Sequence, residues 1–337
     1  MNRYPEVEGL QTYTPNVVRM LTPLALAVSL GACGLNIEHV ADEADTPQAT
    51  TTTQKATPTE TGQQIQTQSQ CDSLKTEGFI TESTGQRQTL YAIGNKYSLP
   101  IKSIDAFSKG AGLTSEAIKN DCVVVPAATI DNVSDEKFAK MRGFSWRPSP
   151  DCPPQDELSI VNAPYRGYDK KSHVGTLVVN KVIADKTAVI FQTVYTNTDF
   201  QIESILPLED IAEPQDKTDD LGTGAKAIDY KSMEQNNTSG LNCRNAVLPQ
   251  GQKPHISAHG TGLAIDVNTR TNPYVLGDEV QPANGTPERS PHRPGLISYK
   301  DEDGAKVINI FKGQGFTWGG DNKDPDYQHF AYDMTRS

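Results

Sequence analysis

The stretch from Ala41 to Gln70 most constrains what this chain can fold into, because it contains almost no large apolar side chain. It is rich in Thr, Gln, Glu and Pro, and a segment of that kind buries too little surface to offset the entropy lost on ordering. The hydrophobic fraction of the whole chain, 36%, is low for 337 residues. A low fraction is expected when part of the chain contributes no hydrophobic core. We therefore expect residues 33–70 to form a flexible tether.

A short apolar run precedes the tether. Residues 20–30 follow Arg19; the run is too short to span a bilayer but suits the apolar region of an export signal. It ends in Leu-Gly-Ala-Cys at 30–33, which resembles a bacterial lipobox, a signal that is cut before the cysteine. The resemblance implies a signal peptide at 1–32 and a lipid on Cys33, hence an exported protein anchored to a membrane of the bacterial cell envelope. The alternative is an ordinary secretory signal with a chance cysteine.

Length and charge limit the number of domains and the classes of partner. A chain of 337 residues suggests two or three domains. The net charge of −11 argues against a sequence-independent grip on nucleic acid, because phosphate contacts need clustered Lys and Arg. We expect no nucleic-acid partner.

Residues 71–127 contain the elements of a small unit. The stretch 89–97 has helical periodicity, and 99–107 forms a second short amphipathic piece. A β-branched run at 122–126 ends in proline and predicts a short strand. The first helix places three apolar side chains on one face: Leu90, Ile93 and Tyr97.

This order of elements resembles the LysM module over roughly 40 residues. The resemblance implies a βααβ domain that binds the GlcNAc-containing glycan of peptidoglycan or chitin. Two departures weaken the implied glycan binding: Ser108 stands where such modules usually carry Asn, and Asp121-Cys122 replaces a Gly-Gln-like turn. The alternative is a spacer domain.

The rest of the chain predicts a polar linker at 128–140 and one domain at 141–337, a normal size for a single core. Strands and helices follow one another in irregular order, which indicates the α+β class with an antiparallel sheet. The expected strands lie at 173–180, 201–207, 262–267 and 329–334, and the expected helices at 181–196 and 304–313.

Four cysteines remain if Cys33 carries lipid. An even number in an exported chain suggests two disulfides, and three connectivities are open. Pairing Cys71 with Cys122 and Cys152 with Cys243 keeps each bridge inside one expected domain, so we favour it. Free or buried thiols are the alternative, which an oxidising envelope disfavours.

Two short segments carry side chains suited to a metal. His259 stands seven residues before Asp266, with glycines between them that permit a tight turn into a strand, and Asp326 stands three residues before His329. Two imidazoles and one carboxylate are a common catalytic zinc set that leaves a fourth position for water, and a further carboxylate can take the proton of that water. Each segment is common by chance, so the prediction depends on their conjunction with Trp-Gly-Gly-Asp at 318–321.

Together the patterns S-x-H-G-x-G-x-A-I-D, W-G-G-D and D-x-x-H-F resemble those of the D-Ala-D-Ala carboxypeptidase and L-Ala-D-Glu endopeptidase family. These zinc peptidases share a fold with the Hedgehog signalling domain, and the resemblance covers roughly residues 143–334. It implies that His259, Asp266 and His329 bind Zn²⁺ and that Asp326 is the general base. Ala331 stands where relatives often carry Glu or Ser shortly after the last motif, which puts the tuning of the site in doubt.

A third segment, residues 232–244, resembles the N-N-T-S-x-F-N-x-R segment of the same family. The resemblance implies that Arg244 holds the substrate and the developing oxyanion, with Ser239 and Asn242 as weaker substrate-binding candidates. The alternative for Arg244 is a surface residue beside a disulfide. Trp318 is a further candidate for lining the substrate groove, with core packing as the alternative.

These interpretations combine into one expected function. We expect an envelope-anchored zinc peptidase that cleaves an amide bond of the peptidoglycan stem peptide, with the LysM-like unit on the glycan and the N-terminal lipid in the membrane. One alternative is a D-Ala-D-Ala carboxypeptidase that trims terminal D-Ala. Another is a peptidoglycan-binding lipoprotein without catalytic activity.

Overall fold

The structure describes the part of the chain that follows the polar stretch. This computed structural model covers residues 70–84, 90–246, 255–287 and 293–336. The expected signal peptide, Cys33 and almost all of the expected tether lie outside the described residues, so they stay predictions. Within those ranges no helix has both the length and the apolar character needed to cross a membrane. The chain divides into units at Met1–Glu60 and Thr61–Ser337, and every described residue belongs to the second.

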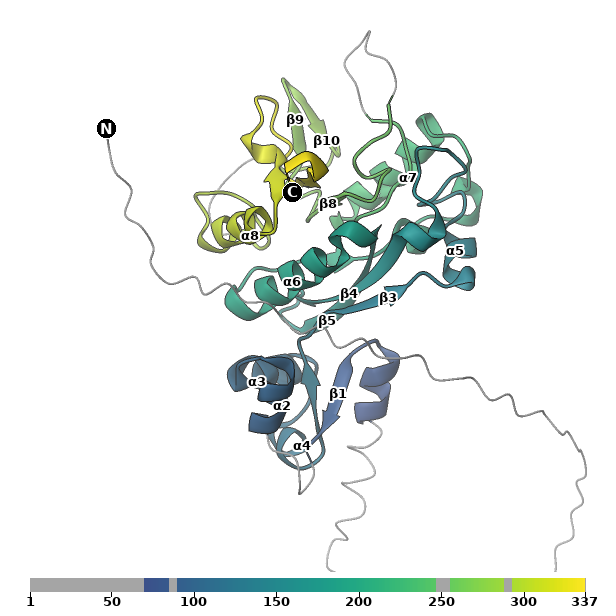
Figure 1. Cartoon of the computed structure of the whole chain (residues 1–337). Helices are drawn as coiled ribbons and strands as arrows, with labels where there is room; N and C mark the ends of the chain where they lie inside the picture. The colour runs from purple at the N-terminus through teal and green to yellow at the C-terminus, as the bar shows by residue number, and fades with distance from the viewer. Residues whose placement is uncertain (1–69, 85–89, 247–254, 288–292, 337) are drawn as a thin grey trace, which may run out of the picture. The chain divides into compact units, whose positions relative to one another are not determined.

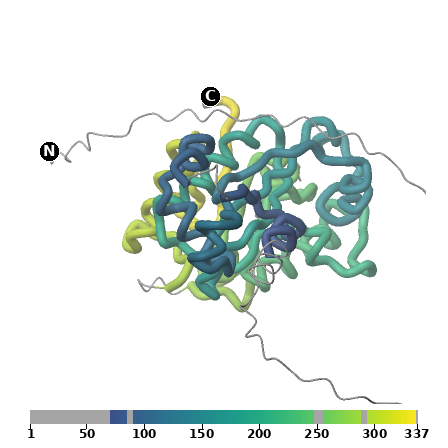
Figure 2. Tube along the Cα trace, turned by 90° about the horizontal axis from the view of Figure 1, so that it is seen from below, coloured from purple at the N-terminus to yellow at the C-terminus, as the bar shows by residue number. Residues whose placement is uncertain are grey.

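Residues 70–127 fold around a two-stranded antiparallel pair, which belongs to the blue part of the tube in Figure 2. All four side chains of the second strand are buried, because helices pack against it. The two expected helices and the closing strand are present, and a third short helix and helical residues at 70–76 add to the expected order. The elements are β1 (Ile80–Ser83), α2 (Leu90–Tyr97), α3 (Ile101–Gly110), α4 (Ser115–Asn120) and β2 (Cys122–Val125).

Ser108 joins α3 to β2 inside this small core. Its side chain is fully buried. The hydroxyl donates to the carbonyl oxygen of Val124 at 3.1 Å and accepts from the amide of Val124 at 2.9 Å. The serine therefore satisfies both backbone groups of a buried strand residue, so the departure from the LysM pattern lies in the core and not on the surface.

A three-stranded antiparallel sheet forms the centre of the larger part, with β4 between β3 and β5. Neighbouring residues of a strand point to opposite faces, so β5 contributes Leu177 and Val179 to one core and Val178 to another. The long helix α6 covers the first face (Figure 1). The bounds are β3 (Thr129–Asn132), β4 (Leu158–Arg166), β5 (Ser172–Asn180) and α6 (Lys181–Asn197).

The stretch 128–140, expected as a linker, contains β3 and helix α5 (Asp135–Met141). Ser134 caps α5, since its side chain accepts from the amide of Lys137 at 3.2 Å. Phe138 and Met141 are buried on the second face of the sheet. The strand and the helix are not expected from the polar composition of this stretch, because each of them buries only a few side chains.

A second three-stranded antiparallel sheet has β12 between β8 and β11 and packs against α8 (Figure 1). The ring of Phe311 in α8 stacks on that of Phe330 in β12, with centroids 3.9 Å apart. The expected helix begins two residues earlier than position 304, because the side chain of Asp301 caps it by accepting from the amide of Gly304. The bounds are β8 (Ala264–Asp266), α8 (Glu302–Gly313), β11 (Phe316–Trp318) and β12 (His329–Tyr332).

The expected strand at 201–207 reduces to a two-residue pair. The side chain of Asn237 takes hydrogen bonds from the amide of Leu206 and the hydroxyl of Ser204, so a side chain replaces part of a strand ladder. The remaining elements are β6 (Ser204–Ile205), α7 (Thr223–Glu234), β7 (Asn237–Thr238), β9 (Tyr274–Leu276), β10 (Glu279–Gln281) and 3₁₀ turns at Gln155–Glu157, Leu208–Asp210, Pro214–Asp216, Gly319–Asp321 and Met334–Arg336.

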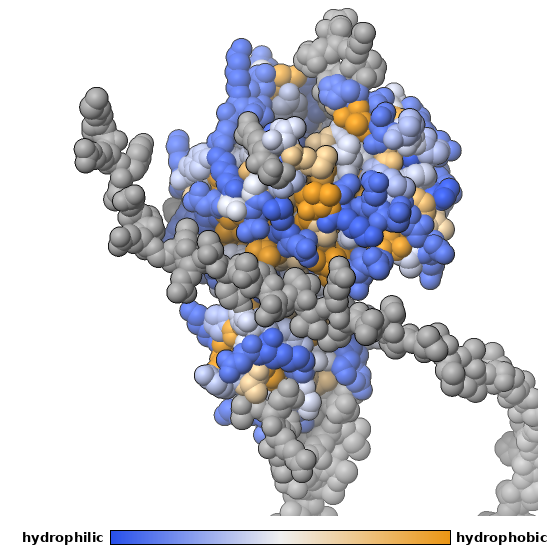
Figure 3. Space-filling model, in the orientation of Figure 1, coloured by the Kyte–Doolittle hydropathy of each residue, from blue (hydrophilic) through white to orange (hydrophobic). Residues whose placement is uncertain are grey.

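Both favoured disulfide pairings are confirmed. Cys71 bonds to Cys122 and Cys152 bonds to Cys243. Each bridge therefore lies within one part of the fold. The face of the described residues seen in Figure 3 is mostly hydrophilic with scattered apolar patches, in keeping with the strongly negative net charge.

We expect the double substitution Cys71→Ser with Cys122→Ser to destabilise residues 70–127 by about 4 kcal/mol, because the bridge joins positions 51 residues apart. Hydrogen exchange followed by mass spectrometry measures the loss as weaker amide protection in β1 and β2. The matched control is Cys152→Ser with Cys243→Ser, which should leave that protection unchanged. Equal protection in all three proteins would contradict the prediction.

Candidate metal centre

The pairing of β8 with β12 brings two of the candidate donors together. In this antiparallel pair Asp266 lies directly opposite His329. Side chains of directly opposed residues lie on the same face of a sheet, so the carboxylate and the imidazole face the same space. Their Oδ1 and Nδ1 atoms are 3.0 Å apart.

The third donor, His259, comes from the turn that leads into β8. The side chain of Ser257 accepts from the amide of His259 at 3.2 Å, which holds the start of the turn. Gly262 has a φ of +70°, and a Cβ there would lie 2.8 Å from the amide nitrogen of Asn180. That amide donates to the carbonyl oxygen of Gly262 at 2.9 Å. Glycine is therefore required where this turn meets the start of α6.

The three donors form a compact set that could hold a metal ion. Nε2 of His259 lies 3.0 Å from Nδ1 of His329 and 3.1 Å from Oδ2 of Asp266, and one ligand atom of each lies within 4.8 Å of the others. Ligand atoms about 2.1 Å from a tetrahedral zinc ion would be about 3.4 Å apart. The donor types and their spacing therefore fit zinc.

A backbone carbonyl orients the ring of His259. Its Nδ1 lies 2.8 Å from the carbonyl oxygen of Gly240, so Nδ1 carries the hydrogen and donates it. The lone pair of Nε2 is then directed at the other two donors. Such a hydrogen bond to the second ring nitrogen is usual for metal-binding histidines.

The charges within the set favour a cation. Burial acts to raise the pKa of Asp266, but the nearby His259 and His329 outweigh it and hold that pKa below its usual range. Burial acts to lower the pKa of His329, and Asp266 outweighs it and raises that pKa. The aspartate is therefore a full negative charge in a shielded place between two imidazoles.

Asp326 adds a second carboxylate beside this set. Burial raises the pKa of Asp326 to about 6, with a further contribution from the charge of Asp266. Its Oδ1 is shielded from solvent and has no hydrogen-bond partner among the described residues. A shielded carboxylate with a raised pKa and a free oxygen is typical of a catalytic acid or base.

The Trp-Gly-Gly-Asp segment holds Asp326 in place. The amide of Asp326 donates to the carbonyl oxygen of Gly319 at 3.0 Å, and a Cβ on Gly319 would lie 2.5 Å from the carbonyl oxygen of Asp326. Trp318 is 4% exposed and part of the core, and its indole nitrogen donates to the carbonyl oxygen of Tyr327 at 3.0 Å. The segment thus braces the loop that carries the carboxylate.

The segment before the turn supplies the remaining candidates. The amide of Ser239 donates to the carbonyl oxygen of Asp266, and the amide of Asp266 donates to that of Ser239, so Ser239 aligns β8 through its backbone. The carbonyl oxygen of Arg244 accepts from the amide of Ser257 at 2.9 Å. Burial has the largest effect on the pKa of Asp326 and of His329, and the charge of Arg244 acts to lower both. Asn242 is 2% exposed; its side-chain amide donates to Asp229, and its backbone amide donates to the carbonyl oxygen of His259.

Two contributors are missing from the sequence-based candidates. Gly240 offers only a backbone oxygen, which no side-chain pattern reveals. Asp229 pairs with Arg244, the Oδ2 and Nη2 atoms being 2.9 Å apart. A signal for Asp229 exists, because it is an acidic residue on the buried face of α7 together with Ile228, Ser232 and Met233.

We expect His329→Ala to weaken zinc binding by more than the roughly 10- to 100-fold that is lost when a hydrogen-bond partner of a metal ligand is removed, because it removes one of the three donors. Isothermal titration of the metal-free protein with zinc measures the change. The matched control is His173→Ala, since His173 is partly exposed on β5 and pairs with Asp169. Equal affinities of the two variants would show that the metal binds elsewhere.

Comparison with known proteins bears on this same part of the chain. The model of a family described as D-alanyl-D-alanine carboxypeptidase matches residues 250–332, which include the three donors and Asp326. The comparisons with curated proteins and with solved structures each found no match. The match supports a place for this part of the chain in that peptidase family.

Proposed function

We propose that the protein is a zinc-dependent hydrolase that cleaves an amide bond in the stem peptide of peptidoglycan. The observation that carries the proposal is the carboxylate of Asp326, whose Oδ1 is shielded and has no hydrogen-bond partner among the described residues, beside the set of His259, Asp266 and His329. The family match over residues 250–332 supports peptidase chemistry at this place.

Each group has a distinct role in the proposed reaction. His259, Asp266 and His329 hold the zinc, which when bound supplies a Lewis acid that polarises a carbonyl oxygen and lowers the pKa of water. Asp326 takes a proton from the attacking water and passes it to the leaving amine. Arg244 donates hydrogen bonds to the oxygen on which negative charge develops.

Trimming of a terminal D-Ala is the specific alternative within this chemistry. The description of the matching family favours it. The non-catalytic alternative, a lipoprotein that only binds peptidoglycan, fits less well, because the donor set and the carboxylate are both present.

We include the envelope location and the glycan-binding unit in the proposal. The lipobox-like sequence ending at Cys33 supports an N-terminal lipid. The two paired strands that enclose α2, α3 and the additional helix α4 support a LysM-like unit that binds glycan. Ser108 is buried, so its side chain is not part of the surface that would bind glycan.

We expect Asp326→Asn to lower the rate of peptidoglycan cleavage by about 10²- to 10⁴-fold while zinc stays bound, because the amide cannot accept the proton. Digestion of purified peptidoglycan, with the fragments identified by mass spectrometry, measures the rate and the bond. Loss of single D-Ala residues indicates trimming, and shortened stems with cut internal bonds indicate an endopeptidase. The control is Asp324→Asn, an exposed carboxylate two positions away. Wild-type rates in Asp326→Asn would remove the residue from the mechanism.

We also expect a zinc chelator to abolish cleavage and added zinc to restore it, because Asp326 and Arg244 alone supply too little polarisation of the amide. The same digestion, before and after dialysis against the chelator, measures this. Full activity in protein shown to be free of metal would contradict the proposal.

A further inference from the structure

Arg244 belongs to a buried group of charged and polar side chains that contact Asp229 of α7. The carboxylate of Asp229 uses both oxygens: Oδ1 accepts from Nδ2 of Asn242 at 3.0 Å, and Oδ2 lies 2.9 Å from Nη2 of Arg244. The residue is buried, so water does not compete freely for either oxygen. The two contacts tie α7 to the segment that carries Arg244.

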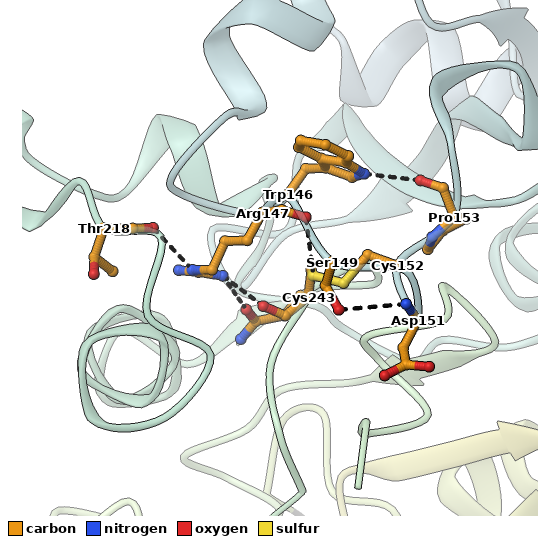
Figure 4. Close-up of a disulfide and its surroundings, with 9 residues drawn as sticks. Trp146, Arg147, Ser149, Asp151, Cys152, Pro153, Thr218 and Cys243 are labelled. Carbon is orange, nitrogen blue, oxygen red and sulfur yellow. Dashed lines mark hydrogen bonds between the residues drawn. A yellow bond between two sulfur atoms is a disulfide. The ribbon is translucent and has the colours of Figure 1, made fainter.

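A second arginine, Arg147, also contacts the segment that carries Arg244. Arg147 is the largest of the fully buried side chains among the described residues. Its Nη1 donates to the carbonyl oxygen of Cys243 at 2.8 Å and approaches Oδ1 of Asn242 at 3.4 Å, and its Nε donates to the carbonyl oxygen of Thr218 at 3.1 Å. Figure 4 shows the guanidinium of Arg147 directed at Cys243 and Thr218, beside the Cys152–Cys243 bridge.

Acidic side chains oppose the repulsion between the two arginines. Burial lowers the pKa of Arg147 to about 10, and the charges of Asp220 and Asp229 oppose this decrease. Arg147 is therefore charged at neutral pH, and like charges repel strongly where water is excluded. Asp229 offsets part of this repulsion and also pairs with Arg244.

The pairing leaves part of the Arg244 fork free. Asp229 takes Nη2, whereas Nε of Arg244 has no hydrogen-bond partner within the described part of the chain, and Nη1 has only a 3.4 Å contact to the carbonyl oxygen of Asn245. A guanidinium that an ion pair already holds on one side loses less conformational entropy when its other nitrogens bind an oxygen.

We propose that Asp229 is a positioning residue, which anchors Nη2 of Arg244 so that the remaining donors of the fork face the substrate oxygen at the metal centre. The proposal rests on the proposed function, because it needs Arg244 to act on the substrate. Asp229 itself touches neither the substrate nor the metal donors in this assignment.

A double-mutant cycle tests the proposal. Asp229→Asn, Arg244→Ala, the double variant and the exposed control Glu234→Gln on the same helix are compared for kcat and KM on soluble muropeptides with full stem peptides. We expect Arg244→Ala to lower kcat by about 10²- to 10³-fold and Asp229→Asn by about 10-fold or more, with zinc content unchanged in both. The double variant should be no slower than Arg244→Ala, because Asp229 acts only through Arg244.

The outcomes separate this inference from the proposed function. A wild-type kcat in Asp229→Asn, or an equal additional loss when it is combined with Arg244→Ala, overturns the positioning role alone. A wild-type kcat in Arg244→Ala overturns the proposed role of Arg244, and the inference with it. A purely structural role of Asp229 predicts a loss of thermal stability and zinc content together with rate, which also overturns the inference.

A readout without turnover covers the case in which Asp229→Asn folds poorly or the substrate is wrong. In the wild type we expect one sharp NMR resonance for the Nε–H of Arg244, identified by its loss in Arg244→Lys. In Asp229→Glu, which keeps the charge but moves it, and in Asp229→Asn, this resonance should shift and broaden. An unchanged resonance in both variants overturns the positioning role.

Discussion

The antiparallel pairing of β8 with β12 is the interaction on which the candidate site depends. It sets Asp266 opposite His329 on one face and Ile265 opposite Phe330 on the other. Both apolar side chains are fully buried, and Phe330 stacks on Phe311. A slip of one residue would turn the donors into the core and the apolar side chains out of it. Burial on one face therefore fixes the register that assembles the donors on the other.

The segment from Asn237 to Arg244 contacts both the metal-donor set and the buried carboxylate of Asp229. At its start the backbone of Ser239 aligns Asp266, and the carbonyl oxygen of Gly240 orients His259. At its end Asn242 and Arg244 both bond to Asp229. One short length of chain thus contacts the donor set at one end and carries the arginine at the other.

Local patterns were sufficient for the elements with strong periodicity and for the donors. Helices α6 and α8 follow from apolar spacing, and the His–Asp–His set follows from motifs whose residues the fold does bring together. The strand expected at 201–207 is only two residues long, because the side chain of Asn237, remote in sequence, replaces part of its ladder bonds. The elements within 128–140 and the pairing of Asp229 with Arg244 depend on contacts with partners distant in sequence. The local pattern marks Asp229 as an acidic residue on a buried face of α7 but does not give its partner.

Strand β5 packs against two layers of the fold, one on each of its faces, and both layers support the site. Leu177 and Val179 face the layer of α6, α8 and the donor-bearing sheet, whereas Val178 faces Leu241 of the segment that leads to Arg244. Alternate positions of one strand therefore contact different layers. A change of side-chain volume at position 178 acts first on the segment that leads to Arg244, whereas a change at position 177 or 179 acts first on the layer of α6 and α8. The packing behind the arginine and the packing behind the donors thus respond to different substitutions, although a single strand supports both.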